Sequence, residues 1–196
     1  MACLAMHLAI AKKYLEINPN ENNELFIKGA YLPDIAENAT KSHYGKNIQI
    51  TSVKDMLDSK IDIVKCASEI NLNDNLNKAI FLHLLTDFLF YNFVYNKKIE
   101  NMSPDEVRKL MYQDYDFTTN YIIKNYQICI PKEISHKISS KEGEPSSTFF
   151  ANNDIDNFIN LISKLNLDLC KKQILKDSKT FLTNFLTKMG KKYDNF

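Results

Sequence analysis

Hydrophobic residues recur every three or four positions along most of this chain, the spacing that places them on one face of an α-helix. The pattern predicts amphipathic helices over residues 3–17, 24–32, 154–172 and 177–188. Residues 79–95 are apolar on nearly every face, which predicts a helix buried on all sides. This run is short for a membrane span, and a central aspartate costs about 2.5–3.5 kcal/mol on membrane-insertion scales. We therefore expect a core helix.

Local sequence signals set the boundaries of other elements. Residues 103–106, Ser-Pro-Asp-Glu, form a capping box with proline in the first turn, which predicts a long helix to about Tyr126. Thr51 or Ser52 can cap a short helix that continues through Leu57.

Proline and polar segments predict where helices stop. Pro33 should end the helix over residues 24–32 and place Asp34 in a tight turn, at the start of a loop over residues 34–46. Residues 131–153 are rich in Ser, Lys and Glu and predict a long loop, which would be a lid or a mobile segment.

The overall pattern predicts an all-α fold, a multi-helix bundle formed by residues 1–196 as a single domain. Strand-like alternation is nearly absent; only residues 47–53 and 127–130 could pair. The chain has only 4 Gly and 5 Pro, which argues against a turn-rich β-sandwich.

Charge and cysteine content narrow the functional classes. The formal net charge is +1, with 25 basic and 24 acidic residues, so there is no strong signal for nucleic-acid or membrane-surface binding. The 4 cysteines are isolated, without zinc-finger spacing, and are expected to be core residues in a reducing cytoplasm. The amino-terminal segment has no basic n-region and no small-residue cleavage site, so we expect no signal peptide and a cytoplasmic protein.

His83 and Asp87 are the most informative pair of residues. Four positions apart, they share one face of an otherwise apolar helix. A buried carboxylate needs a cation or a proton. A metal ion would satisfy both groups, and a His–Asp hydrogen bond that braces helix packing is the structural alternative.

Three further groups of ligand type precede this pair. His7 lies at the edge of the apolar face of the first helix, Asp34 follows Pro33, and His43 lies nine residues later. Each also has a simpler explanation: a core histidine for His7, a turn residue for Asp34 and a surface residue for His43.

Taken in order, MHLAIA, GAYLPD, KSHY and FLHLLTDFLFYN resemble the motifs of the bacterial zinc-dependent phospholipase C family, which is related to the single-strand-specific zinc nucleases. The resemblance covers residues 1–95 and is nearest to short members of that family. It implies that Asp34, His43, His83 and Asp87 bind one metal ion. It also implies that Asp87 bridges to a second ion near His7.

Two nitrogen and two carboxylate ligands suit Zn, and Fe or Mn would also accept them. The secreted phospholipases use an amino-terminal tryptophan and further histidines after the HxxxD helix. This chain has no Trp, and no histidine follows in that region, so we expect one or two ions.

The resulting hypothesis is a metal-dependent hydrolase that acts on a small phosphorylated substrate. Asp34 is the expected catalytic group, and Asp34 or Asp87 would orient or deprotonate the water. The alternative is a metal-stabilised, non-catalytic binding or immunity-type protein, and plain structural histidines without metal are a third possibility. The sequence leaves the substrate and the oligomeric state open.

The remaining polar candidates have simpler explanations. His136, in the long loop, is expected to be solvent-exposed. Asp114 and Asp116 are expected to lie on a solvated edge or to orient metal ligands. Lys41 and Lys46 flank His43 and could contact a phosphate, although chance proximity is the simpler explanation in a lysine-rich chain.

Overall fold

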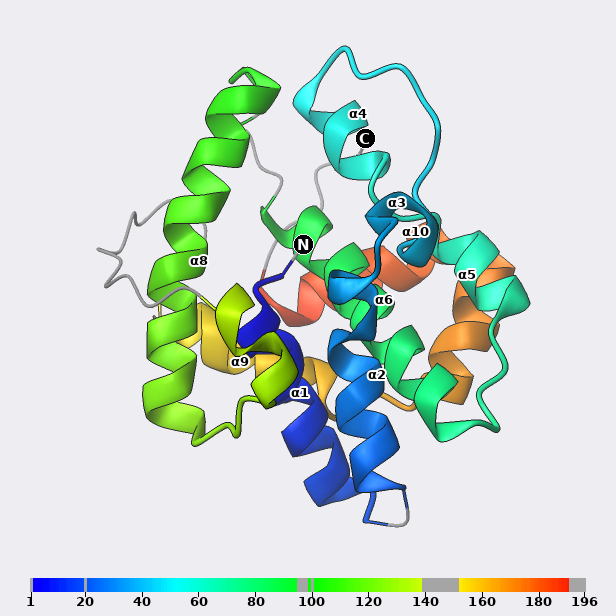
Figure 1. The fold of residues 1–196 in the computed structure, drawn as a ribbon. Helices are drawn as coiled ribbons and strands as arrows, with labels where there is room; N and C mark the ends of the chain where they lie inside the picture. Colours follow the sequence, from blue (N-terminus) through cyan, green and yellow to red (C-terminus); the bar gives the residue numbers. More distant parts are fainter. Residues whose placement is uncertain (1, 20, 95–98, 100, 139–151, 191–196) are drawn as a thin grey trace.

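A computed structural model describes residues 2–19, 21–94, 99, 101–138 and 152–190 of the chain. All regular elements in this part are helices, and it contains no strand, as predicted (Figure 1). The elements are α1 (Leu4–Ile17), α2 (Asn23–Ile35), α3 (Ala39–Ser42), α4 (Val53–Asp58), α5 (Ile63–Glu69), α6 (Asn75–Val94), α8 (Pro104–Tyr126), the 3₁₀-helix η1 (Lys132–Lys137), α9 (Asn152–Ile162) and α10 (Leu167–Lys188). Among the described helices, none combines the length and the apolar character needed to cross a membrane.

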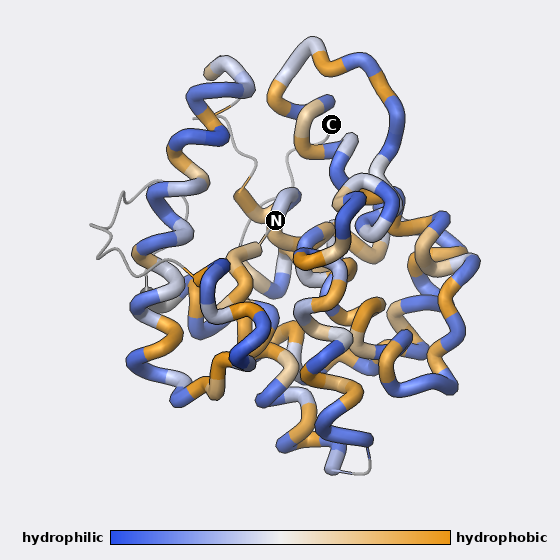
Figure 2. The backbone as a smooth tube through the Cα atoms, in the orientation of Figure 1, coloured by the Kyte–Doolittle hydropathy of each residue, from blue (hydrophilic) through white to orange (hydrophobic). Residues whose placement is uncertain are grey.

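Helix α6 is the central element of the bundle. It packs against α1, α2, α5 and α10, while α8 and α9 pack against α1 (Figure 1). Buried side chains occur on every face of α6, which confirms the prediction of a core helix. On the outer helices, hydrophobic and hydrophilic positions alternate along the tube (Figure 2), because each of these helices has one face toward the core and one toward solvent.

Gly29 allows α2 to approach α6 closely. A Cβ atom built at Gly29 would lie 2.6 Å from Cβ of Ala79 and 2.6 Å from the carbonyl oxygen of Leu76, both on α6. Real Cβ atoms essentially never lie this close to another heavy atom, so the helices can approach this closely only with glycine at position 29. This close approach places the carboxyl end of α2 beside the middle of α6.

The capping predictions are confirmed. Ser103 and Glu106 form the reciprocal capping box at the start of α8. The Ser52 hydroxyl accepts a hydrogen bond from the backbone N–H of Asp55 and so caps α4. Each contact satisfies a backbone donor that the first turn of a helix leaves unpaired.

The prediction that Pro33 ends α2 is wrong. The helix continues to Ile35, with Pro33 inside it and Asp34 in its last turn. Proline removes one backbone donor, and the last turn tolerates this loss. The predicted loop over residues 34–46 also contains the short helix α3.

The carboxyl-terminal helices break at different places from those predicted. The helix expected over residues 154–172 is interrupted after Ile162, and Asn166 caps the start of α10. Asp177 has non-helical backbone angles inside α10 (φ −163°, ψ 94°), and its carboxylate accepts hydrogen bonds from the N–H groups of Lys179 and Thr180. Asp177 therefore starts a new helical segment, as predicted, but at a kink.

Neither predicted strand forms: residues 47–52 and 127–130 are irregular. Residues 132–137 of the predicted loop form η1, and residues 139–151 lie outside the described part of the chain. Of the cysteines, Cys3, Cys66 and Cys170 are buried as expected, whereas Cys129 is exposed.

Candidate metal site

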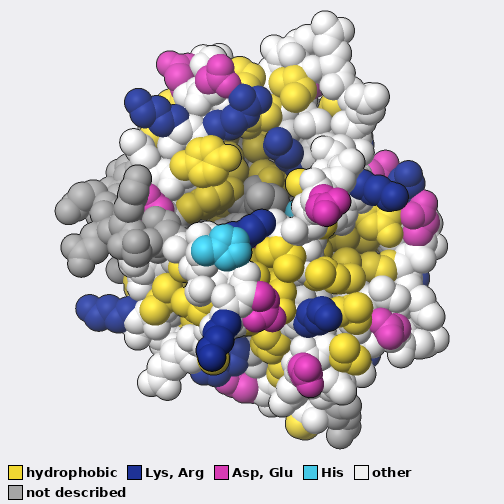
Figure 3. Space-filling model, in the orientation of Figure 1, with side chains coloured by type: hydrophobic (Ala, Val, Ile, Leu, Met, Phe, Trp, Pro, Cys, Tyr) yellow, Lys and Arg dark blue, Asp and Glu magenta, His cyan; other side chains and the backbone are white. Residues whose placement is uncertain are grey.

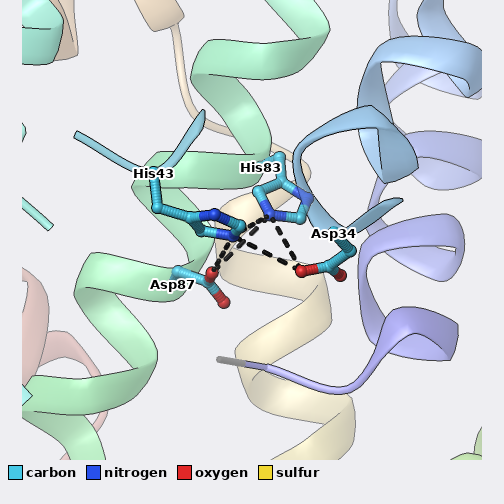
Figure 4. A group of neighbouring side chains, drawn as sticks. All are labelled: Asp34, His43, His83 and Asp87. Carbon is cyan, nitrogen blue, oxygen red and sulfur yellow. Dashed lines mark hydrogen bonds and ion pairs between the residues drawn. The ribbon is translucent and has the colours of Figure 1, made fainter. Parts of the chain in front are cut away.

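Three elements bring Asp34, His43, His83 and Asp87 together. Asp34 comes from the last turn of α2, His43 from the end of α3, and His83 and Asp87 from successive turns of α6 (Figure 4). One ligand-type atom from each lies within 4.8 Å of the other three. We refer to these four side chains as the Asp–His cluster. It is a group that could hold a metal ion.

The turn after α3 orients His43 toward α6. Tyr44 adopts a left-handed conformation (φ 53°), the N–H of Gly45 donates to the carbonyl of Thr40, and the N–H of Tyr44 donates to the carbonyl of Lys41. These are the two hydrogen bonds of a Schellman motif, which reverses the chain at a helix end. The Ser42 hydroxyl also donates to the carbonyl of Pro33 at 2.9 Å, which joins α3 to α2.

The spacing of the cluster atoms matches a single bound ion. Nε2 of His43 lies 3.2 Å from Nε2 of His83, 3.4 Å from Oδ1 of Asp34 and 3.5 Å from Oδ2 of Asp87. Nε2 of His83 lies 3.7 Å and 3.6 Å from the same two oxygens. Zinc bonds of about 2.0–2.2 Å in a tetrahedron imply ligand separations of about 3.3–3.6 Å. The observed separations fall close to that range.

Backbone contacts fix the tautomer of both cluster histidines. Nδ1 of His83 lies 2.8 Å from the carbonyl oxygen of Ala30, and Nδ1 of His43 lies 2.9 Å from that of Ala39. A carbonyl can only accept, so both Nδ1 atoms carry the proton. In the neutral rings, both Nε2 atoms then direct lone pairs into the cluster. A second-sphere contact of this type is typical of metal-ligating histidines.

With both histidine rings neutral, the cluster therefore contains acceptors without donors. Oδ1 of Asp34 and Oδ2 of Asp87 are buried and have no hydrogen-bond partner among the described residues. His43, His83 and Asp87 are buried as well. A buried carboxylate without a donor is costly. One proton on either ring would serve only one neighbour, whereas a cation satisfies all four atoms together.

The charge states favour a cation. Burial raises the pKa of both carboxyl groups, but the neighbouring imidazoles more than offset this and hold the pKa of Asp34 and Asp87 below the usual range. Burial and the adjacent ring of His7 lower the pKa of His83 to about 4. Burial also lowers the pKa of His43, but Asp34 and Asp87 outweigh it and raise that pKa. At neutral pH, two ionised carboxylates thus face a neutral His83.

The structure places His7 next to the cluster, near Oδ1 of Asp87, the carboxylate oxygen that does not face His43 and His83. Its ring stacks on that of His83, with centroids 3.7 Å apart and planes at 15°. Its Nε2 lies 3.2 Å from Oδ1 of Asp87, within ion-pair distance but without hydrogen-bond geometry, and neither ring nitrogen has a hydrogen-bond partner in the described chain. Oδ1 of Asp87 accepts the backbone N–H of Ala2 at 2.6 Å.

Three further candidates from the sequence, His136, Asp114 and Asp116, are not part of the cluster. His136 is exposed on η1, as predicted. Asp114 is buried, which contradicts the solvated edge for this residue, while its other expected role, orienting a metal ligand, stays a prediction; Asp116 is half-buried.

Sequence reasoning missed several residues around the site. The carbonyls of Ala30 and Ala39 have no sequence signal, because any residue has one. Tyr91, one helical turn after Asp87, could have been found from its spacing. Tyr91 and Tyr115 line a cavity that also includes His43. Burial and then Asp87 raise the pKa of both tyrosines well above 10, so they remain protonated.

The comparisons with known proteins give no relative for this chain: no family model, no curated protein and no solved structure matches it.

Proposed function

We propose that the Asp–His cluster binds a divalent transition metal, with zinc as the best fit, and that the chain is a metal-dependent hydrolase of phosphoesters. The observation that carries this proposal is the convergence of four acceptor atoms, with separations of 3.2–3.7 Å among the pairs that involve His43 or His83, in a buried setting without donors. The motif order of the sequence, which resembles that of zinc-dependent phospholipases C and includes the same four residues, agrees with this proposal.

Two imidazole nitrogens and two carboxylate oxygens form a ligand set of intermediate softness, which suits zinc, iron or manganese. His7 and Oδ1 of Asp87 would contribute to a second ion. When bound, a divalent ion lowers the pKa of a water molecule toward about 7 and polarises a phosphoryl oxygen.

The residues of the chain have separate roles in this proposal. Asp34 has the most accessible side chain of the cluster, 9% exposed against 5% or less for the other three. It would orient the attacking water and accept its proton. Tyr91 and Tyr115 line the neighbouring cavity and would contact a bound substrate there.

The test begins with protein purified without chelator, whose metal identity and stoichiometry are measured by elemental analysis. A panel of phosphomonoesters and phosphodiesters is then assayed. We expect turnover that a chelator abolishes and zinc or manganese restores, and Asp34→Asn should reduce kcat more than it raises KM. Protein that contains no transition metal and binds none on titration contradicts the proposal.

A specific observation also favours the alternative, a metal-stabilised binding protein without turnover. Four protein atoms would complete a tetrahedral shell around a bound ion, and closed shells are typical of structural zinc. Spectra of a cobalt-substituted protein separate the two functions. Addition of a phosphoester should change the cobalt spectrum of an enzyme, because the ligand enters the coordination sphere, and should leave that of a closed structural site unchanged.

A further inference from the structure

A cavity of about 470 Å³ opens beside the Asp–His cluster, within the range of small-molecule sites. One wall is α8; the other is formed by α4 and the irregular chain on both sides of it. His43 belongs to both the cluster and the cavity wall. Figure 3 shows hydrophobic and basic side chains gathered around the hollow in this part of the surface.

The charged side chains that line the cavity are all basic. They are Lys46, Lys60 and Arg108, from three different segments, and no Asp or Glu is part of the described lining. A divalent ion in the cluster would be neutralised by Asp34 and Asp87. The attraction for an anion therefore comes from the three basic side chains and not from the metal centre.

Arg108 and Lys60 lie on opposite walls and influence each other. Burial and the positive charge of Arg108 both lower the pKa of Lys60. Within the described chain, Lys60 has no ion pair with an acidic side chain. Arg108, the single arginine of this lysine-rich chain, donates from Nη1 to Oδ1 of Asp105 at 2.5 Å. Its other N–H groups can still bind phosphate oxygens in the planar, two-pronged geometry that lysine lacks.

The rest of the wall is apolar. Met56 and Leu57 on α4 and Met111 on α8 are buried, and each contributes to the lining. Tyr112 is 67% exposed and Ile48 42% exposed, and both also line the cavity. A hydrated inorganic anion would leave these surfaces without a partner, whereas an organic group would cover them.

We propose that this cavity binds a phosphomonoester dianion that carries an apolar or aromatic group. Arg108 and Lys60 bind the phosphate, and Tyr112 with the apolar wall contacts the organic group. As an assignment of substrate class, this inference rests on the proposed function. It excludes zwitterionic phosphodiesters as preferred ligands, because their cationic group would face three basic side chains.

The test measures binding to zinc-loaded protein by calorimetry, with phenyl phosphate, inorganic phosphate and phosphorylcholine as probes. Phenyl phosphate should bind best. Lys60→Met and Arg108→Met should each weaken it by about tenfold, as expected for a lost charge-assisted hydrogen bond. The matched control is Lys109→Met, which removes the same charge from the neighbouring exposed position on α8 without touching the cavity. Tyr112→Ala should weaken phenyl phosphate and leave inorganic phosphate unchanged.

The outcomes separate this inference from the proposed function. Phenyl phosphate binding that depends on Lys60 and Arg108 supports the inference. If no phosphoester is hydrolysed, that absence of turnover contradicts only the proposed hydrolase activity. Turnover of p-nitrophenyl phosphate with unchanged KM in both variants overturns the inference and leaves the enzyme intact. The inference is also overturned if phosphorylcholine binds as tightly as phenyl phosphate. It is likewise overturned if Lys109→Met weakens phenyl phosphate binding as much as Lys60→Met and Arg108→Met do.

A parallel arm identifies the source of the phosphomonoester. Vesicles of phosphatidylcholine with and without phosphatidic acid are sedimented with the protein. Binding that requires phosphatidic acid and Arg108 supports a lipid-borne phosphomonoester, and binding of phenyl phosphate alone supports a soluble one. Binding of neither overturns the inference.

Discussion

The Nε2 atoms of His43 and His83 lie 3.2 Å apart, and each ring donates from Nδ1 to a backbone carbonyl. Two imidazole lone pairs that face each other at this distance are repulsive unless a proton or a cation lies between them. The carbonyls of Ala30 and Ala39 prevent either ring from turning its N–H inward without losing a hydrogen bond. The fold thus fixes a geometry that is unfavourable when empty and favourable around a positive ion.

Metal removal should lower the thermal stability of the protein. A ligand that binds only the folded state adds about 2.7 kcal/mol at a free concentration of one hundred times its Kd. For a chain of this length, we expect Tm to rise by about 5–10 °C when zinc is added to chelator-treated protein. The measurement is a melting curve at increasing zinc concentration. A Tm that does not depend on zinc would contradict metal binding.

Loss of a single cluster residue should remove the metal. His83→Ala and Asp87→Asn should each lower zinc affinity by at least about 100-fold, since loss of even an outer contact to a ligand costs about 10–100-fold. The control is His136→Ala, because His136 is the remaining histidine outside the site and is exposed. Zinc occupancy in each purified variant checks this prediction. Full occupancy in both cluster variants would show that the ion lies elsewhere.

The close approach of α2 to α6 at Gly29 should affect zinc binding, although Gly29 itself is not part of the cluster. Gly29→Ala introduces a Cβ 2.6 Å from the backbone oxygen of Leu76, so the helices must separate. We expect a loss of about 1–3 kcal/mol in the free energy of unfolding, typical of overpacking, and weaker zinc binding because Asp34 moves away from α6.

Gly190→Ala is the control for Gly29→Ala. Nothing lies within 4 Å of an added Cβ at Gly190, and the positive φ of 73° alone makes the change unfavourable. It should destabilise the protein mildly with zinc affinity unchanged. Equal zinc affinities in the two variants would show that separation of α2 from α6 does not displace the metal ligands.

Zinc binding should release a proton below the raised pKa of His43. The two carboxylates hold a proton on His43 up to a higher pH than the ordinary value of 6.5, and the metal must displace it. Apparent affinity should fall by about tenfold per pH unit below that pKa and level off above it. Calorimetry in buffers with different ionisation enthalpies counts the released protons. Affinity that stays constant between about pH 5 and 8 would contradict a role for His43 as a ligand.

The amount of structure that the sequence determined differs from element to element. The helices α1, α6 and α8 follow from local signals: apolar spacing, a continuous apolar run and the Ser103–Glu106 capping box. These signals act between residues three or four positions apart, so they can be read without the fold. The extension of α2 through Pro33 could not be predicted from local signals. Packing on α6 stabilises the last turn although proline lacks a backbone N–H.

The sequence by itself also determined which metal-ligating side chains are available, and its helical spacing placed His83 and Asp87 on one helical face. Only the tertiary structure decided that Asp34 and His43 reach this pair, since their approach depends on Gly29 and on the turn at Tyr44. It also decided the tautomers, through carbonyls that any residue could supply. The basic cavity shows the same limit: Lys46, Lys60 and Arg108 are unremarkable among many cations until three segments fold to one surface. Local patterns report on near neighbours, whereas a site depends on convergence of distant ones.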